Sequence, residues 1–298
     1  MSRTPYSKPF LSYSAQLSLL KSRGMTFSDE AKTVYLLEKI GYYRLSGYWY
    51  PLLADKKKHI FKSNSNFETA FSLYKFDREL RKLISAEIEK IEVAIRAKMA
   101  YELSMAYQPF WIEDSSLFTS SRNHSTTLDK INEEYARSNE EFITAFKRKY
   151  SNPLPPACII LEVTSFGTLS RLYRNLKPSK AKRDVAKSFN LSDKVFDSWL
   201  HSLTCVRNVC AHHARLWNSQ IKIQPLSPKK PKDIWLINNA ICNNRVYYIF
   251  SMIIYLLNTV NPKHTFKQKL QNLFLKYPNV DKAAMGFPPD WQNEPLWK

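Results

Sequence analysis

The most regular pattern of apolar positions lies in residues 66–104. Apolar side chains recur there at steps of three and four, which is the spacing of one face of an α-helix. Polar residues fill the positions between them, so the pattern predicts one long amphipathic helix or two nearly collinear helices. The apolar positions are Leu73, Phe76, Leu80, Ile84, Ile88, Ile91, Ile95 and Met99.

Helical spacing continues through most of the remaining chain. Ser28 and Ser192 each precede acidic residues and are expected to be N-caps. The sequence predicts a mainly α-helical protein, with a Pro/Trp-rich tail that docks by its tryptophans. The further predicted helices are residues 14–23, 28–40, 127–150, 157–175 (interrupted near SFGTLS), 192–217 and 238–260, with breaks at 152–156 and 219–235.

Residues 41–53, GYYRLSGYWYPLL, form an aromatic segment flanked by glycine. Such a composition is compatible with a β-hairpin or wing. Together with the two preceding helices it suggests a small nucleic-acid-binding module over residues 1–60. The alternative is a helical cap that packs on the main domain, and the sequence leaves both open.

Composition restricts the class of protein. The chain has 298 residues, 44% of them hydrophobic, with only 5 glycines, which excludes bulk disorder and collagen-like architecture. The longest apolar run, Val246–Leu257, is too short to span a bilayer. No apolar leader begins the sequence, and its four cysteines form no CxxC. We expect a reduced cytoplasmic protein with no membrane partner.

The formal net charge of +19 is unevenly distributed. Residues 1–60 carry +6, residues 161–219 carry +6 and residues 220–298 carry +7, whereas residues 61–160 are balanced. A concentrated excess of this size indicates a polyanionic partner such as nucleic acid. Candidate RNA-binding residues cluster in one basic segment at Lys180, Lys182, Arg183 and Lys187.

Residues 201–218, HSLTCVRNVCAHHARLWN, carry the candidate chemistry. On an ideal helix one packing stripe contains Trp199, Leu203, Val206, Cys210, His213 and Trp217. The opposite side contains His201, Cys205, Asn208, His212 and Arg215, with Arg207 between the two faces. Arg207 would then reach round the helix, or a second helix or subunit would complete the site.

Arg207, Asn208 and His212 are suited to RNA cleavage by attack of the 2′-OH. An imidazole can transfer protons near neutral pH, and a guanidinium can stabilise charge on the phosphate. Asn208 could orient the phosphate or the imidazole. No metal or other cofactor is needed for this chemistry. The alternative, zinc held by cysteines and histidines of the same stretch, is disfavoured because those side chains face different sides of the helix.

Five segments are distinctive: IGYYRLSGYWYPL (40–52), FDRELRKLISAEIEKIEVAIR (76–96), FGTLSRLYRNL (166–176), SWLHSLTCVRNVCAHHARLWN (198–218) and MGFPPDW (285–291). In these segments and in their order the sequence resembles the Abi-like family of abortive-infection proteins, the AbiD/AbiF group. Arg207–His212, RNVCAH, also matches the R-x4-6-H motif of HEPN domains.

The resemblance implies a HEPN-like helical bundle over residues 61–298, with an insertion at about 111–150 and a C-terminal tail. It implies a bacterial antiphage, toxin-like role and metal-independent ribonuclease activity in a homodimer, where two motifs face one cleft. Glu92 and Arg96 would support the motif helix, as would Arg215. A small noncoding RNA is a further implied ligand. Two other functions stay open: non-catalytic RNA binding, and DNA binding through residues 1–60.

Overall fold

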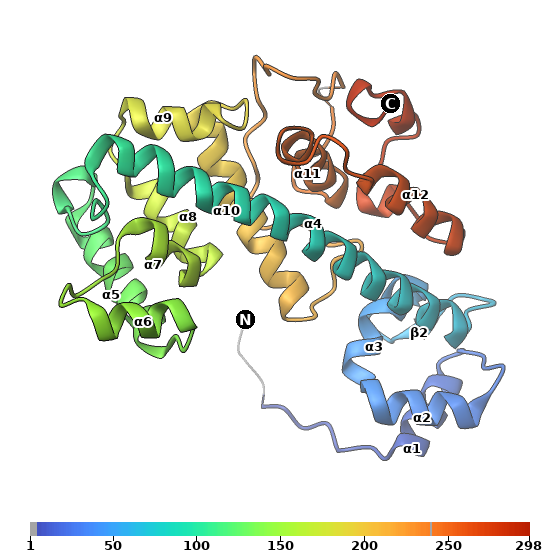
Figure 1. The fold of residues 1–298 in the computed structure, drawn as a ribbon. Helices are drawn as coiled ribbons and strands as arrows, with labels where there is room; N and C mark the ends of the chain where they lie inside the picture. Colours follow the sequence, from blue (N-terminus) through green and yellow to red (C-terminus); the bar gives the residue numbers. More distant parts are fainter. Residues whose placement is uncertain (1–4, 239) are drawn as a thin grey trace. The chain divides into compact units, whose positions relative to one another are not determined.

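A computed structural model describes residues 5–238 and 240–298 of the chain. Residues 1–4, at the start of the predicted N-terminal module, and Asn239, within the predicted helix 238–260, lie outside the described residues. The described part is mainly α-helical with one two-stranded sheet, which confirms the predicted fold class (Figure 1). None of its helices is long and apolar enough to cross a membrane.

The chain divides into two compact units, and the long helix α4 (Phe67–Tyr107) belongs in part to each. Unit 1 contains residues 5–79 and 273–280, and unit 2 contains residues 80–272 and 281–298. The single helix α4 confirms the prediction from the apolar spacing in residues 66–104. Its stripe, from Phe76 to Met99, is almost completely buried.

Unit 1 begins with three short helices and a hairpin. They are α1 (Tyr13–Ser22), α2 (Glu30–Ile40), α3 (Tyr42–Trp49), β1 (Leu53–Asp55) and β2 (Ile60–Phe61). Asp29, not the predicted Ser28, caps α2, because the Asp29 carboxylate accepts the Lys32 N–H at 2.9 Å. The Ser28 N–H instead donates to the Glu68 carboxylate.

The prediction of a hairpin or wing at residues 41–53 is wrong, because most of that segment forms α3. Gly41 has φ +93°, a conformation that glycine adopts without steric cost, and it ends α2 and starts α3. Leu45 and Trp49 are four residues apart and both buried, so burial on one helical face overrides the strand preference of the aromatic residues. The antiparallel hairpin β1–β2 follows α3.

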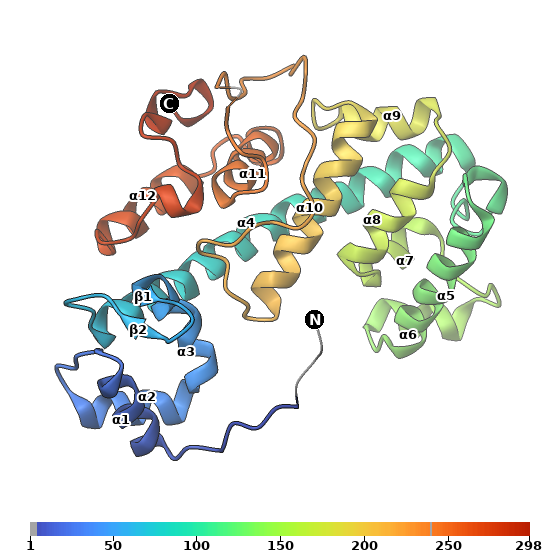
Figure 2. The same cartoon turned by 180° about the vertical axis from the view of Figure 1, so that it is seen from behind.

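Unit 2 is built around α10 (Asp193–Ala211), which packs against α8 and α9 (Figure 2). Helix α5 also packs against α8. The other helices of this part are α5 (Ser121–Arg137), α6 (Glu141–Lys149), α7 (Ala157–Val163), α8 (Phe166–Asn175), α9 (Lys180–Lys187), α11 (Val246–Val260) and α12 (Phe266–Lys276), the last ending in unit 1.

Two predicted helices of unit 2 have different bounds in the structure. Residues 127–150 belong to two helices, because the backbone adopts an extended conformation at Ser138, the C-cap of α5. Helix α11 begins only at Val246, preceded by turns in the polar segment Cys242–Arg245, whose composition favours turns. The interruption predicted near SFGTLS is confirmed at the boundary between α7 and α8.

The C-terminal tail docks by its tryptophans, as predicted. Trp291 and Trp297 are buried, with their ring centroids 5.1 Å apart. The Trp297 indole stacks on Tyr247 of α11 and donates its N–H to the Ser251 hydroxyl at 3.0 Å. The tail therefore covers an apolar helix that is buried along its length.

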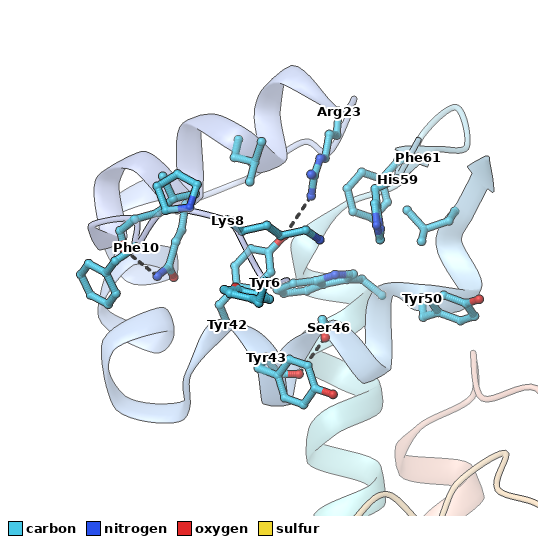
Figure 3. A pocket seen from close by; sticks show the side chains of 16 residues that line it. Tyr6, Lys8, Phe10, Arg23, Tyr42, Tyr43, Ser46, Tyr50, His59 and Phe61 are labelled. Atoms are coloured by element: carbon cyan, nitrogen blue, oxygen red, sulfur yellow. Dashed lines mark hydrogen bonds between the residues drawn. The ribbon is translucent and has the colours of Figure 1, made fainter. Parts of the chain in front are cut away.

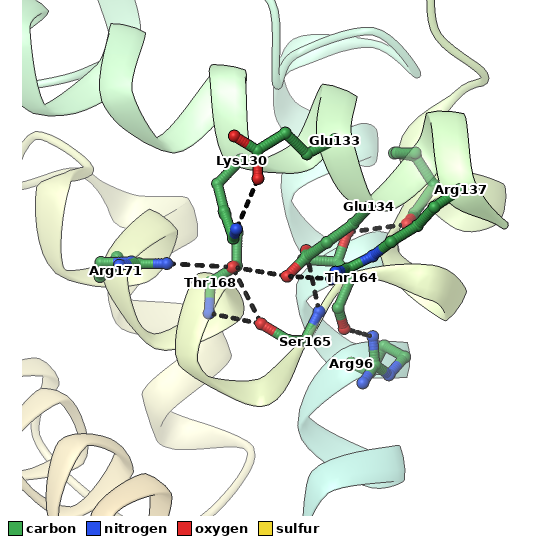
Figure 4. A network of polar contacts seen from close by, with 10 residues as sticks. Arg96, Lys130, Glu133, Glu134, Arg137, Thr164, Ser165, Thr168 and Arg171 are labelled. Atoms are coloured by element: carbon green, nitrogen blue, oxygen red, sulfur yellow. Dashed lines mark hydrogen bonds and ion pairs between the residues drawn. The ribbon is translucent and has the colours of Figure 1, made fainter.

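A buried carboxylate organises the junction between α7 and α8 (Figure 4). Glu134 of α5 accepts the backbone N–H of Ser165 at 3.1 Å and the hydroxyl of Thr168 at 3.2 Å. Ser165 is the N-cap of α8, so the carboxylate also lies near the positive end of that helix. The bond thereby fixes α8 against α5.

We expect Glu134→Ala to lower the free energy of unfolding by about 1–3 kcal/mol, since the buried Thr168 hydroxyl and the part-buried Ser165 N–H lose their acceptor. Chemical denaturation measures this change. Glu133→Ala is the matched control: Glu133 is exposed and forms a surface ion pair with Lys130, so its removal changes stability by about 0.5 kcal/mol or less. Equal losses in the two variants would contradict the role of Glu134.

Candidate functional site

The candidate motif lies at the C-terminal end of α10. Ser192 caps the start of this helix, as predicted, by accepting the Val195 N–H. Arg207 and Asn208 lie in its last turns and His212 is its C-cap residue. Helix α10 therefore ends at Ala211, six residues before the predicted end at Trp217.

The early end has a defined backbone geometry. His213 has φ +56°, in the left-handed region. The His213 N–H donates to the Cys210 carbonyl at 3.1 Å and the Ala214 N–H to the Val209 carbonyl at 3.0 Å. This pair of bonds is a Schellman motif, which satisfies the last carbonyls of a helix and reverses the chain.

The placement of His213 on the packing stripe was therefore wrong. His213 is exposed, because the stripe holds only as long as the helix continues. Trp217 is buried as predicted, but it lies in the loop after the helix. The stripe members that precede the reversal, from Trp199 to Cys210, are buried as the spacing predicts.

Arg207, Asn208 and His212 are held together by short-range contacts. The Arg207 guanidinium donates to the Asn208 side-chain oxygen at 3.4 Å, and the His212 N–H donates to the Asn208 carbonyl at 2.9 Å. Asn208 and His212 are exposed and Arg207 is half-buried. The long Arg207–Asn208 bond uses one of five guanidinium donors, so the others are available for a phosphate oxygen.

Helix α8 contributes a cation to the same side of α10. Both carboxylate oxygens of Asp197 accept from Arg174 Nε, at 3.1 and 3.2 Å. His201, Cys205 and Asn208 follow Asp197 at steps of four, four and three, which places them on one helical face. Arg174 was not predicted as a site residue, although the segment FGTLSRLYRNL that contains it carried part of the family resemblance.

Burial and Arg174 change the titration of this face. Burial lowers the pKa of His201 below its ordinary value, the charge of Arg174 lowers it further, and Asp197 opposes both. Burial also raises the pKa of the Cys205 thiol, against the opposing charge of Arg174. Both shifts favour the uncharged forms, the neutral imidazole of His201 and the thiol of Cys205.

The pair Glu92–Arg96 lies at another place in unit 2. Arg96 is buried and donates to the Glu92 carboxylate at 2.7 Å and to the Thr164 carbonyl at 2.6 Å. Thr164 is the C-cap of α7, so the pair ties α4 to the junction that Glu134 organises (Figure 4). No contact described for the chain joins this pair to Arg207 or His212.

The predicted RNA-binding residues of α9 have different environments. Lys180 and Lys187 both pair with Asp184, and Arg183 is exposed. Lys182 instead points inward, where its ammonium donates to the carbonyls of Arg174 and Leu176 at the end of α8. Burial accordingly lowers the pKa of Lys182. The structure thus gives Lys182 a capping role, whereas Lys180, Arg183 and Lys187 are exposed.

The loop after the motif runs back along α10. The Ser202 hydroxyl donates to the Ile223 carbonyl at 3.1 Å, and the Ser198 hydroxyl accepts the Leu226 N–H at 2.9 Å. No Asp or Glu occurs between Asp197 and Asp233 in the sequence. The cations of that acid-free stretch are Arg207, Arg215, Lys222, Lys229, Lys230 and Lys232, and Arg215 among them is half-buried.

The C-terminal segment supports this loop. Arg245 donates to the Asn218 side chain at 2.8 Å and also to the Ala284 carbonyl. Gly286 lies two residues after Ala284 and has φ +88°. A Cβ atom at this position would collide with the Arg245 side chain. Glycine is therefore required at this position of MGFPPDW, one of the segments that carry the family resemblance and for which the sequence predicted no function.

Among the residues that the structure describes, no group of three or more His, Cys, Asp or Glu side chains is placed to hold a metal ion. Cys210 is buried in the packing face, whereas His212 is exposed beyond the helix end. The two side chains thus belong to different environments.

A family model described as "Abi-like protein" matches residues 35–218, which is more than half of the chain. The chain belongs to the Abi-like protein family. The match extends from α2 to Asn218 and includes α8 and the whole of α10, so the motif of this Abi-like protein lies inside it. A search of curated proteins and a search of solved structures gave no match.

Family membership confirms the resemblance and supports a role in abortive infection. The HEPN fold and the ribonuclease activity stay predictions.

We expect Arg174→Ala to raise the pKa of His201. The substitution removes a neighbouring cation and leaves the Asp197 carboxylate to stabilise the imidazolium. NMR titration of the His201 ring protons measures the change. Lys194→Ala, an exposed change on α10, is the control and leaves the titration unaltered. A pKa that falls or stays constant in Arg174→Ala would contradict the assignment.

Proposed function

We propose that this Abi-like protein is a HEPN-type endoribonuclease that cleaves RNA during phage infection by attack of the 2′-OH. The observation that carries the proposal is the group Arg207, Asn208 and His212 at the end of α10, in which Asn208 and His212 are exposed and Arg207 is half-buried. His212 transfers protons between the 2′-OH, the leaving 5′-oxygen and solvent. Arg207 stabilises the negative charge that develops on the phosphate, and Asn208 orients it.

The surroundings of this group support an RNA substrate. The carbonyls at a helix C-terminus repel phosphate, so an anionic substrate needs cations close by. Arg207 itself and Arg215, three residues after His212, supply them, whereas Lys229 and Lys230 of the acid-free loop lie beside residues 190–195 at the other end of α10. Arg174 neutralises Asp197, which lies about three turns earlier on the same face of α10 as Asn208 and would otherwise repel an RNA backbone along that face.

Two copies of the chain are proposed to form the complete site. The sequence shows one R-x4-H motif of this form, and a composite cleft needs two. In a homodimer, which brings the same surface of each copy together, the two α10 ends face each other. Arg207 of one copy then acts on the phosphate with His212 of the other.

Non-catalytic RNA binding is the second candidate, and one observation favours it. The stretch 198–232 contains cations and no acidic residue, so it can attract RNA whether or not His212 transfers a proton. A small noncoding RNA that restrains the protein would be a suitable ligand for it. Salt-sensitive RNA binding without cleavage under any condition would favour this function over the first.

We expect His212→Ala to lower the rate of RNA cleavage by about 10²- to 10⁴-fold, the usual contribution of a general acid–base. Cleavage by the unaltered protein should persist in EDTA and leave 2′,3′-cyclic phosphate ends, which gel assays and end analysis detect. His213→Asn is the control, because asparagine tolerates the left-handed conformation and the variant removes only the neighbouring imidazole. Undiminished cleavage by His212→Ala, or its loss in EDTA alone, would contradict the proposal.

The composite site makes a separate prediction. Arg207→Ala and His212→Ala should each be inactive, and a mixture that exchanges subunits should regain activity, because a mixed dimer contains one intact combination of Arg207 and His212. The cleavage assay measures this regain, and sedimentation should show a dimer. An active monomer, or a mixture no more active than its components, would contradict the composite site.

A further inference from the structure

Unit 1 contains a cavity of about 830 Å³ that the candidate site does not use (Figure 3). Its wall combines the N-terminal segment 6–11, helices α1 and α3 and the hairpin β1–β2. The volume lies in the range of small-ligand sites. Segments from four parts of the chain converge here, so the cavity is a feature of the folded unit.

Aromatic rings dominate the lining. Tyr42 and Trp49 are in edge-to-face contact with their centroids 5.1 Å apart, and Arg23 donates to the Tyr42 hydroxyl at 3.1 Å, so this corner is preorganised. Tyr6 and Tyr43 are 84% and 91% exposed, although they line the same cavity. Exposed rings beside a rigid aromatic corner provide stacking faces for a flat, unsaturated ligand.

The charged residues of the lining are all potential cations. Lys8, Arg23 and His59 contribute to it, and none of its described residues is Asp or Glu. Figure 3 shows the three side chains on one side of the rings of Tyr6 and Tyr43. Tyr50 of the lining also has a cation next to it, since the Lys56 ammonium lies 5.2 Å from the centre of its ring. The lining is therefore suited to a ligand that is both aromatic and anionic.

One polar atom of the lining lacks a partner. Gln16 donates its amide N–H to the Leu11 carbonyl at 3.0 Å, which sets the orientation of the amide. Its oxygen is buried and accepts no hydrogen bond within the described chain. A buried acceptor without a donor is unfavourable, so this oxygen is suited to an N–H of the ligand. An exocyclic amine on an aromatic ring provides that donor.

We propose that this cavity binds a nucleotide, with its base stacked on the aromatic rings, a base N–H on Gln16 and its phosphate beside Lys8, Arg23 and His59. Aromatic rings with basic residues are the chemistry by which proteins hold unpaired bases. The nucleotide is either a free mononucleotide or an unpaired residue of single-stranded RNA. This site is separate from Arg207–His212, and its occupation does not require that the protein cleave RNA.

The test uses the full-length His212→Ala protein, in which the probe is not cut. One arm titrates AMP, CMP, GMP and UMP by calorimetry. The other arm titrates a single-stranded octanucleotide containing 4-thiouridine, measures anisotropy, and maps the photocrosslinks by mass spectrometry. Binding in the first arm identifies a free nucleotide as a ligand, and binding in the second arm alone identifies unpaired RNA. In the second case crosslinks should fall in residues 6–11 or 42–50.

Tyr43→Ala should weaken binding of the ligand so identified by about 5- to 150-fold, the range for the loss of one base–aromatic stack. Gln16→Leu should also weaken binding, because it removes the acceptor for the base N–H, and thermal denaturation checks that the fold withstands the loss of the Gln16–Leu11 bond. Lys8→Ala should reduce the dependence on salt by about one phosphate contact. Tyr35→Ala is the matched control, since Tyr35 is an exposed tyrosine of unit 1 outside the cavity, and it should bind normally.

Failure of both probes to bind would overturn the proposal. So would crosslinks confined to unit 2, or equal binding by Tyr43→Ala, Gln16→Leu and Tyr35→Ala. These outcomes leave the cleavage proposal intact, because the cleavage assay addresses other residues. Conversely, absence of cleavage by the unaltered protein leaves the nucleotide site intact.

Discussion

The reversal of the chain after α10 is the constraint on which the candidate site depends. His213 adopts the left-handed conformation, which costs a residue other than glycine about 1–2 kcal/mol. Two backbone hydrogen bonds at the helix end and the burial of Trp217 beyond it offset that cost. As a result His212 is exposed one turn after Asn208, and the cationic loop returns along the helix that carries Arg207.

The same constraint explains which part of the site was predictable. Arg207, Asn208 and His212 were recognisable because their residue types and spacing are local properties of the sequence. The end of α10 was not, since helices usually stop at glycine and here the left-handed position is occupied by histidine. Arg174 was also missed, because its proximity to His201 depends on the packing of α8 on α10.

The fold shows a similar division between local and tertiary causes. Helix α4 was predictable from eight apolar positions because their spacing alone determines the buried face. The segment 41–53 was misassigned because its aromatic composition favours strands, whereas Leu45 and Trp49 bury one face of a helix. The sequence of this segment alone does not indicate that Leu45 and Trp49 pack on the same helical face. Gly286 was visible in the sequence, but its close approach to Arg245 was not.

The net charge of the chain indicates how strongly it attracts an external anion only after the contacts of each cation within the protein are taken into account. Lys182 caps α8, Lys180 and Lys187 share Asp184, and these three contribute less to an external anion than their number suggests. The stretch after Asp197 has no acidic residue to neutralise its cations over residues 198–232. In unit 1 the cavity likewise has cations and no carboxylate among its described lining residues. The +19 charge therefore includes two regions without acidic residues, the stretch 198–232 and the described lining of the cavity, and a basic helix, α9, whose lysines also make contacts within the protein.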